Sequence, residues 1–249
     1  MSGQFQDKVV LITGGSRGLG RAMAEGFAKE GAKLAIVSRK LEACDETAEA
    51  LRTAYGSEVM TRSTHVGNWD DLDAMVDEVI EHFGQIDVLI NNAGMSPLYP
   101  SLSDISEALF DKVVSVNLKG PFRLMANVGE RMQKDGGGAI VNISSSASVT
   151  KSPHAEPYGA AKSGLNALTR SFAAAYGPEV RVNCIMAGPF LTDISDAWDM
   201  EAFNERARTT IPMQRGGQAN EIVAAALYFA GEGASFTTGA ILAVDGGSH

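Results

Sequence analysis

Short apolar runs alternate along the chain with longer stretches in which apolar residues recur at helical spacing. Runs such as VVLIT and DVLIN are apolar at almost every position, which is typical of strands covered on both faces of a sheet. The predicted strands are Lys8–Thr13, Lys33–Ser38, Glu58–Arg62, Ile86–Asn91, Gly138–Ser144, Val180–Met186 and Ala240–Asp245. The predicted helices occupy residues 18–30, 42–55, 70–83, 106–133, 158–177 and 219–230.

The alternation of strands and helices indicates parallel strands joined by right-handed crossovers. Glycines stand near the ends of four predicted helices, where a left-handed C-terminal cap favours this residue, at Gly31, Gly56, Gly84 and Gly177. No linker, low-complexity tract or internal repeat interrupts the pattern. We therefore expect residues 1–249 to form a single α/β domain, doubly wound in the manner of a Rossmann fold, with helices on both faces of the sheet.

One stretch, residues 190–213, departs from this alternation. It carries several aromatic and aliphatic residues among acids and lies between a predicted strand and the last long helix. Long excursions of this kind in compact domains often act as lids or substrate loops. We predict a substrate-loop excursion with one or two short helices; the alternative is a surface helical pair that covers the sheet edge.

Composition narrows the range of partners. The formal net charge is -9, which disfavours nucleic acid and anionic membranes, because phosphate binding relies on clustered Lys and Arg. The sequence shows no signal peptide and no apolar run long enough to span a bilayer. Its two cysteines, Cys44 and Cys184, are far apart in sequence, so we expect reduced thiols in a cytoplasmic protein, and we expect Cys184 to be a packing residue. No histidine has metal-ligand spacing.

A glycine cluster follows the first predicted strand in the segment TGGSRGLG, and Gly14, Gly18 and Gly20 belong to it. Glycines let the backbone approach a pyrophosphate without a Cβ clash, and the N-terminus of the next helix offers free N–H groups to phosphates. An ordinary turn is the alternative. The position after the first strand of an α/β sheet favours a dinucleotide site.

The end of the second strand indicates which dinucleotide binds. An acid there would bond the adenosine ribose and repel a 2′-phosphate, but the chain has Ser38 and Arg39, followed by Lys40. Arg17 of the glycine loop can reach the same pocket and would form charge-assisted bonds to a phosphate. We therefore predict NADP(H) over NAD(H). The alternative is that Arg39 and Lys40 are solvated and either cofactor binds.

Tyr158 and Lys162 are one helical turn apart and so share a face of their predicted helix. Ser145 lies at the carboxyl end of the fifth strand, where a cofactor would bind, and Ser144 or Ser146 could take its place. Asn117 stands in a largely apolar helical face, which invites a backbone irregularity or a water site; a purely structural asparagine is the alternative.

Together these segments resemble the short-chain dehydrogenase/reductase family over essentially the full length, through TGGSRGLG, NNAG, VNLKG, NISS, YGAAK, VRVNCIMAGPFLT and VDGG. Within that family the chain looks similar to 3-oxoacyl reductases and gluconate 5-dehydrogenases. The resemblance implies a seven-stranded parallel sheet, a homotetramer or homodimer, and a catalytic tetrad of Asn117, Ser145, Tyr158 and Lys162. It assigns Asn117 a water-mediated proton path to Lys162, and Thr192 a bond to the nicotinamide carboxamide.

The expected chemistry is hydride transfer between a nicotinamide and a carbonyl carbon. The ketone oxygen then needs a proton, which Tyr158 would supply; Lys162 and the oxidised nicotinamide would lower the pKa of its phenol. Ser145 would donate a hydrogen bond to the substrate oxygen.

The candidate cofactor-binding residues are Gly14, Ser16, Arg17, Gly18, Leu19, Gly20, Ser38, Arg39, His65, Val66, Asn92, Ala93, Gly94, Tyr158, Lys162, Gly188 and Thr192. His65 departs from the family pattern, which often has Asp there, so its contact with adenine is open.

The candidate substrate-binding residues are Ser96, Ser145, Ser146, Tyr158, Phe190 and Trp198. They suggest a moderately apolar, uncharged carbonyl compound or its alcohol. Two other functions remain as alternatives: a 3-oxoacyl-(acyl carrier protein) reductase, and a non-catalytic dinucleotide-binding regulator.

Overall fold

A seven-stranded sheet forms the middle of three layers in the computed structural model, which describes residues 3–151, 153–193, 195 and 198–249. The strands are β1 (Val9–Thr13), β2 (Lys33–Ser38), β3 (Val59–Ser63), β4 (Val88–Asn91), β5 (Gly138–Ser145), β6 (Val180–Ala187) and β9 (Ile241–Val244). All pair in parallel in the order β3-β2-β1-β4-β5-β6-β9. The predicted doubly wound α/β fold and its seven-stranded parallel sheet are confirmed.

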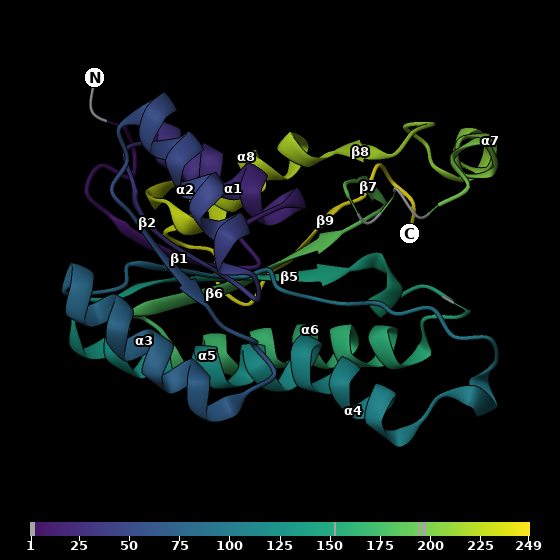
Figure 1. The fold of residues 1–249 in the computed structure, drawn as a ribbon, viewed down its shortest axis with the longest axis horizontal. Coiled ribbons are helices and arrows are strands. Elements are labelled where there is room, and N and C mark those ends of the chain that lie inside the picture. Colours follow the sequence, from purple (N-terminus) through teal and green to yellow (C-terminus); the bar gives the residue numbers. More distant parts are fainter. Residues whose placement is uncertain (1–2, 152, 194, 196–197) are drawn as a thin grey trace.

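Helices cover both faces of this sheet (Figure 1). One layer contains α1 (Gly18–Lys29), α2 (Leu41–Tyr55) and α8 (Val223–Ala230). The other contains α3 (Trp69–Phe83), α4 (Glu107–Val114), α5 (Gly120–Lys134) and α6 (Glu156–Tyr176). The single helix predicted over 106–133 is in fact two helices joined by a π-helical turn, η2 (Ser115–Lys119), and the helix predicted over 219–230 begins with a 3₁₀ turn at Ala219–Ile222.

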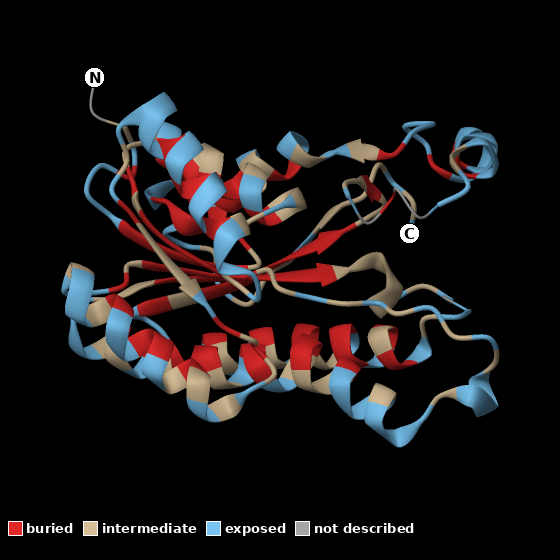
Figure 2. Ribbon diagram, in the orientation of Figure 1, coloured by how far each residue is buried: buried red, intermediate tan, exposed pale blue. Residues whose placement is uncertain are grey.

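The near-continuous apolar strands supply two cores, one on each face of the sheet. Val10 and Ile12 of β1 pack with Phe27 of α1, whereas Val9 and Leu11 of the same strand belong to the opposite core. Successive strand residues point to opposite faces, so a strand buried on both sides has to be apolar throughout. Figure 2 shows the buried strands and the inward faces of the helices in red.

Three of the four predicted glycine caps have the expected left-handed backbone. Gly31, Gly56 and Gly84 have φ values of 86°, 68° and 89°. The prediction was wrong for Gly177, whose φ of -68° and ψ of 148° are extended. Pro178 follows it, and the residue before a proline is driven to extended conformations by the proline ring.

The excursion over residues 190–213 contains one helix, α7 (Met200–Thr210), and the short strand β7 (Phe190–Leu191). β7 pairs with β8 (Gly217–Gln218) beyond the excursion, so a two-stranded ladder holds the base of this segment. Phe203, Ala207 and Ile211 form a small apolar core of their own. Residues 194, 196 and 197 lie outside the described part. No helix in the described ranges is long and apolar enough to cross a membrane.

Candidate active site

A large cavity of about 1430 Å³ opens at the carboxyl ends of the central strands. Its wall is built from the loops that follow β1, β2, β3, β4, β5 and β6, together with α7. Every predicted site residue lines it except Gly20 and Asn117. The sheet therefore brings together side chains that are far apart in the sequence, as expected for ligand sites of doubly wound folds.

The glycine loop after β1 is locked to the segment after β4. Asn92 Nδ2 donates to the main-chain oxygens of Thr13 (2.9 Å) and Gly14 (3.1 Å). In return, Thr13 Oγ1 accepts hydrogen bonds from the main-chain N–H groups of Asn92 and Ala93, both at 3.1 Å. These bonds fix two backbone segments that line one wall of the cavity.

Two glycines of the loop are required by its geometry. Gly18 has a φ of +52°, and a Cβ there would lie 3.4 Å from Thr192 Cβ, at the entrance of the excursion. A Cβ on Gly20 would lie 2.1 Å from the Gly14 carbonyl oxygen. Gly20 is buried behind the cavity wall rather than on it, so its absent side chain lets α1 approach the loop.

The end of the cavity beside β2, where the sequence predicts that adenosine binds, is basic. Arg17 and Arg39 line it, and neither side chain has an ion pair within the described ranges. Ser16 Oγ donates to Ser38 Oγ at 2.9 Å, which ties the glycine loop to the end of β2. The described acids on the cavity wall are Asp193 and Asp199, both in the excursion rather than beside β2.

His65 and Val66 line the same part of the cavity. His65 Nδ1 accepts a hydrogen bond of 3.1 Å from the Gly67 main-chain N–H. A neutral ring in this arrangement carries its proton on Nε2, so it offers the cavity a donor and not the acceptor that Asp would offer.

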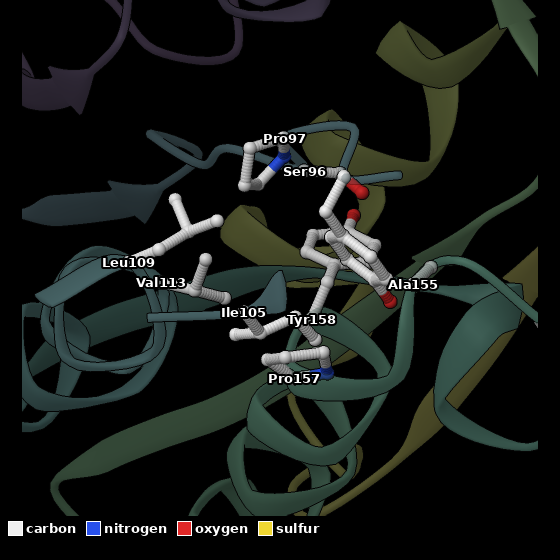
Figure 3. Close-up of a pocket in the computed structure, with 9 residues that line it drawn as sticks. Ser96, Pro97, Ile105, Leu109, Val113, Ala155, Pro157 and Tyr158 are labelled. Carbon is white, nitrogen blue, oxygen red and sulfur yellow. The ribbon is translucent and has the colours of Figure 1, made fainter. Parts of the chain in front are cut away.

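Tyr158 lies on α6, between the large cavity and a small apolar niche of about 10 Å³. Figure 3 shows Ile105, Leu109, Val113 and Pro157 around that niche beside the Tyr158 ring. A niche of this size is at the lower limit for one water molecule. The ring is therefore poorly hydrated on that side.

Burial among these groups raises the pKa of the Tyr158 phenol, and a hydrogen bond from Ser145 opposes the shift. The sequence predicts that Lys162 and an oxidised nicotinamide together lower the pKa of Tyr158. The side chains of the protein alone do not lower it. The ammonium of Lys162 lies 5.8 Å from the centroid of the Tyr158 ring. Desolvation of the phenolate outweighs the stabilisation that the surrounding side chains provide.

Ser145 is the last residue of β5, and its side chain lies close enough to Tyr158 to lower the pKa of the phenol. Its Oγ also accepts a bond of 3.2 Å from the Ala147 N–H. Ser144 is buried, and its hydroxyl donates to the main-chain oxygen of Lys162. Among the three serines considered from the sequence, the contact with Tyr158 favours Ser145.

Lys162 is 3% exposed, and its ammonium donates a bond of 2.7 Å to the Ile143 main-chain oxygen. Burial lowers the pKa of Lys162 to about 8. A Cβ on Gly94 would lie 3.6 Å from Lys162 Nζ and 3.0 Å from Asn117 Oδ1. The missing side chain of Gly94 therefore lets the NNAG segment pass close to Asn117, whereas Lys162 would tolerate a Cβ at an ordinary contact distance.

Asn117 is fully buried in the π-helical turn, so the predicted backbone irregularity is present at this residue. Its Nδ2 donates to the Met95 and Val113 main-chain oxygens at 2.8 and 2.9 Å, and its Oδ1 accepts from the Met95 N–H at 3.2 Å. The side chain thus binds the segment after β4 to the turn between α4 and α5. The water-mediated path from Asn117 to Lys162 stays a prediction.

Sequence reasoning missed several side chains at the outer end of the cavity, apart from His154, for which it left open an approach to the substrate mouth or a solvated loop position. Lys151 and His154 from the loop before α6, and Arg206 from α7, line it with Asp193 and Asp199. Single charged residues in loops carry no motif that would identify them. The expectation of an uncharged substrate did not take these charged side chains into account. Within the described ranges no cluster of His, Cys, Asp and Glu could hold a metal ion.

Comparison with known proteins gives consistent relatives. A family model described as enoyl-(acyl carrier protein) reductase matches residues 14–249. An uncharacterized oxidoreductase from Thermotoga maritima is 39% identical over 98% of both chains. Levodione reductase from Leifsonia aquatica is 36% identical over 98% of this chain and 95% of that protein. The crystal structure of L-sorbose reductase from Gluconobacter frateurii, complexed with NADPH and L-sorbose, is 28% identical with a TM-score of 0.93, covering 100% of this chain and 98% of that chain.

Proposed function

Because the chain belongs to the short-chain dehydrogenase/reductase family, a family of oxidoreductases, we propose that it interconverts a ketone and a secondary alcohol with NADP(H). The observation that carries this proposal is that Ser145, Tyr158 and Lys162 line the large cavity together, with the Ser145 side chain close enough to Tyr158 to lower the pKa of its phenol. It supports the proposal because a phenol that could act as acid/base and a hydroxyl that could donate a hydrogen bond line the same cavity as the glycine loop.

The residues of the cavity fit a nicotinamide dinucleotide. Gly18 has a φ that suits glycine, and Gly94 leaves room where a Cβ would crowd Asn117. Arg17 and Arg39 offer positive charge that no acid pairs within the described residues. The glycine loop would hold the pyrophosphate, and Asn92 to Gly94, with Lys162, the nicotinamide ribose. The bound cofactor supplies the hydride acceptor or donor. Gly188 and Thr192 would border its carboxamide.

In the reducing direction, Tyr158 donates its proton to the ketone oxygen while Ser145 donates a hydrogen bond to the same atom. In the oxidising direction, Tyr158 accepts the alcohol proton. The raised pKa of Tyr158 keeps the phenol protonated at neutral pH, which suits the acid role. The positive charge of Lys162 counters the phenolate that proton donation leaves behind.

The preference for NADP(H) rests on the two arginines at the adenosine end. They face no acid on β2, so a 2′-phosphate would meet two guanidiniums rather than a carboxylate. L-sorbose reductase, which shares this fold, was crystallised with NADPH. Titration of the protein with NADPH and NADH tests the preference, and tighter binding of NADH would refute it.

A panel of ketones and alcohols assayed with NADPH and NADP tests the activity. The decisive variant is Tyr158→Phe, which should bind NADPH as the wild type does and lose turnover by a factor on the order of 1000. Turnover by this variant at a large fraction of the wild-type rate would remove Tyr158 from the mechanism.

The same panel separates the alternatives. A 3-oxoacyl group on an acyl carrier protein should react no faster than the corresponding small thioester, since α6 offers a carrier only Arg170 as an exposed cation after Lys162. A regulator without catalysis would bind NADPH, but it would not oxidise NADPH in the presence of any ketone of the panel.

We propose a homotetramer or homodimer as the assembly. Exposed apolar side chains support it, among them Phe110 of α4 and Phe236 before β9. Molar mass measured by light scattering after gel filtration tests this. A cytoplasmic location is proposed from the two free, buried cysteines, and fractionation of cells checks it.

A further inference from the structure

A chain of polar groups with no part in the proposed chemistry runs behind the active site, from β6 through α6 to the end of β5. It contains Cys184, Asn166 and Ser148, and none of the three lines the large cavity. Cys184 and Asn166 are buried, at 0% and 6% exposure. Buried polar side chains of this kind need partners, and here each one is the partner of the next.

The direction of each hydrogen bond in this chain is fixed. Burial raises the pKa of Cys184 to about 11, so its thiol keeps its proton and donates to Asn166 Oδ1 at 3.6 Å. The opposite end of the amide, Asn166 Nδ2, donates to Ser148 Oγ at 2.9 Å. The Ser148 hydroxyl has two acceptors for its own proton, the Ser145 main-chain oxygen at 2.6 Å and Met186 Sδ at 3.5 Å, and the shorter contact to the stronger acceptor favours Ser145.

The turn at Ser146–Ser148 is attached to α6 at two further points. Ser163 Oγ donates to the Ser148 main-chain oxygen at 2.6 Å. A Cβ on Gly159 would lie 2.8 Å from the Ala147 main-chain oxygen, so the helix and the turn are in close contact there. α6 also carries Tyr158 and Lys162. The turn and the helix are thus held together on the side away from the cavity.

We propose that Asn166 and Ser148 are positioning residues, which set Ser145 against Tyr158 by tying the end of β5 to α6. Neither residue touches the reacting atoms. Their effect passes through the backbone of Ser145, whose hydroxyl bonds Tyr158 on the cavity side. The inference rests on the proposed oxidoreductase function, since it assigns these residues to the geometry of that site.

The test uses Ser148→Ala, Asn166→Leu and their combination in the full chain. Each single variant should lower kcat/KM for the best ketone of the panel by about tenfold, because a small displacement of a proton-transfer pair is costly. The double variant should lose no more than the larger single loss, since both act in one chain of bonds. NADPH affinity should stay at the wild-type value.

The matched control is Thr169→Val. Thr169 is a buried hydroxyl on the same helix that bonds Asn142 and the Leu165 main-chain oxygen. It also interacts with Cys184, at the far end of the polar chain, but none of its hydrogen bonds reaches Asn166, Ser148 or the turn. This variant should lose stability and keep kcat/KM. If Thr169→Val lowers kcat/KM as much as Asn166→Leu does, the effect is general loosening of α6 and the proposal is wrong.

Two readouts separate positioning from mere stability. In a Ser145→Ala background, Ser148→Ala should cause no further loss of kcat/KM, whereas an independent effect would persist and overturn the proposal. The pKa of Tyr158, followed by NMR of labelled tyrosine with Tyr158→Phe for assignment, should rise in Ser148→Ala and in Ser145→Ala alike. An unchanged pKa in Ser148→Ala contradicts the inference.

The pKa readout needs no turnover, so it remains informative if no ketone of the panel reacts. Absence of turnover in the wild type refutes the proposed function. The positioning of Ser145 by Ser148 is then tested only by the pKa of Tyr158 in Ser148→Ala. Ser148→Ala removes one hydroxyl from a partly exposed turn, and it covers the case in which Asn166→Leu fails to fold.

Discussion

The buried ammonium of Lys162 and the main-chain oxygen of Ile143 are 2.7 Å apart and share a hydrogen bond. Ile143 lies two residues before Ser145 in β5, so this bond joins the base of α6 to the strand that carries the serine. The bond satisfies one of the three protons of the ammonium. It does not offset the loss of water, as the lowered pKa of Lys162 shows.

Stability should depend on pH through this group. With a folded pKa of about 8 and an ordinary value of 10.5, both states are protonated below about pH 8, and the desolvation cost is present in full. Between these values the unfolded state binds more protons, so stability rises with pH. Urea unfolding should show the wild type gaining up to ~3 kcal/mol relative to Lys162→Met between about pH 7 and pH 10. A difference that is flat with pH contradicts this.

The two arginines at the adenosine end should discriminate between the dinucleotides. Arg39→Ala should weaken NADPH binding by about tenfold and leave NADH binding nearly unchanged, because only NADPH carries the 2′-phosphate. Fluorescence titration with both cofactors measures this. Arg21→Ala is the control, since Arg21 pairs with Glu25 on the outside of α1 and does not line the cavity. If Arg39→Ala weakens the binding of NADPH and NADH equally, Arg39 contacts a part that both cofactors share and not the 2′-phosphate.

The glycine loop should not tolerate a methyl group at Gly20. A Cβ there would lie 2.1 Å from the Gly14 carbonyl oxygen, and both groups belong to backbone that cannot move aside without shifting the loop. Gly20→Ala should weaken NADPH binding more than tenfold. Gly56→Ala is the comparison: its φ is +68° and its Cβ would meet nothing within 4 Å. Gly56→Ala should lower the free energy of unfolding by roughly 1 kcal/mol and leave NADPH binding unchanged. A normal NADPH affinity in Gly20→Ala would contradict the prediction and show that the loop adapts.

Asn117 should contribute to stability as well as to catalysis. Asn117→Ala removes three hydrogen bonds to buried or half-buried backbone of Met95 and Val113. Leaving such groups unpaired costs about 1–3 kcal/mol, which thermal and urea unfolding would detect. Asn127→Ala, which removes a side-chain bond from α5 to Asp73 of α3, should cost less. An Asn117→Ala protein as stable as the wild type would mean that water replaces the amide.

The strands were predictable from the sequence because their burial on both faces produces runs of apolar residues. Lys33–Ser38 was predicted with its observed bounds, and the other strands within two residues. The two-residue strands β7 and β8 were not predictable, since so short a pair has no periodicity. The break at Asn117 was expected as an irregularity, but the π-helical form depends on bonds to Met95, which is distant in sequence.

Motifs identified the residues on the cavity wall because the carboxyl ends of parallel strands meet at one edge. The network behind that wall was not found. Cys184 was expected to be a packing residue, and Asn166 and Ser148 belong to no pattern that separates them from other core and turn residues. Which charged side chains reach the outer cavity likewise depends on the path of the excursion.

Only one strand, β4, stands between the strand that ends in the glycine loop and the strand that ends in Ser145. Neighbouring strands are about 4.8 Å apart, so the two halves of the site are held roughly 10 Å apart by hydrogen-bonded backbone. Side-chain replacement in the loops above the edge leaves that spacing untouched. Under the proposed function, a chain built in this way could exchange one substrate for another through the loops above this edge, while the spacing between the glycine loop and Ser145 stays constant.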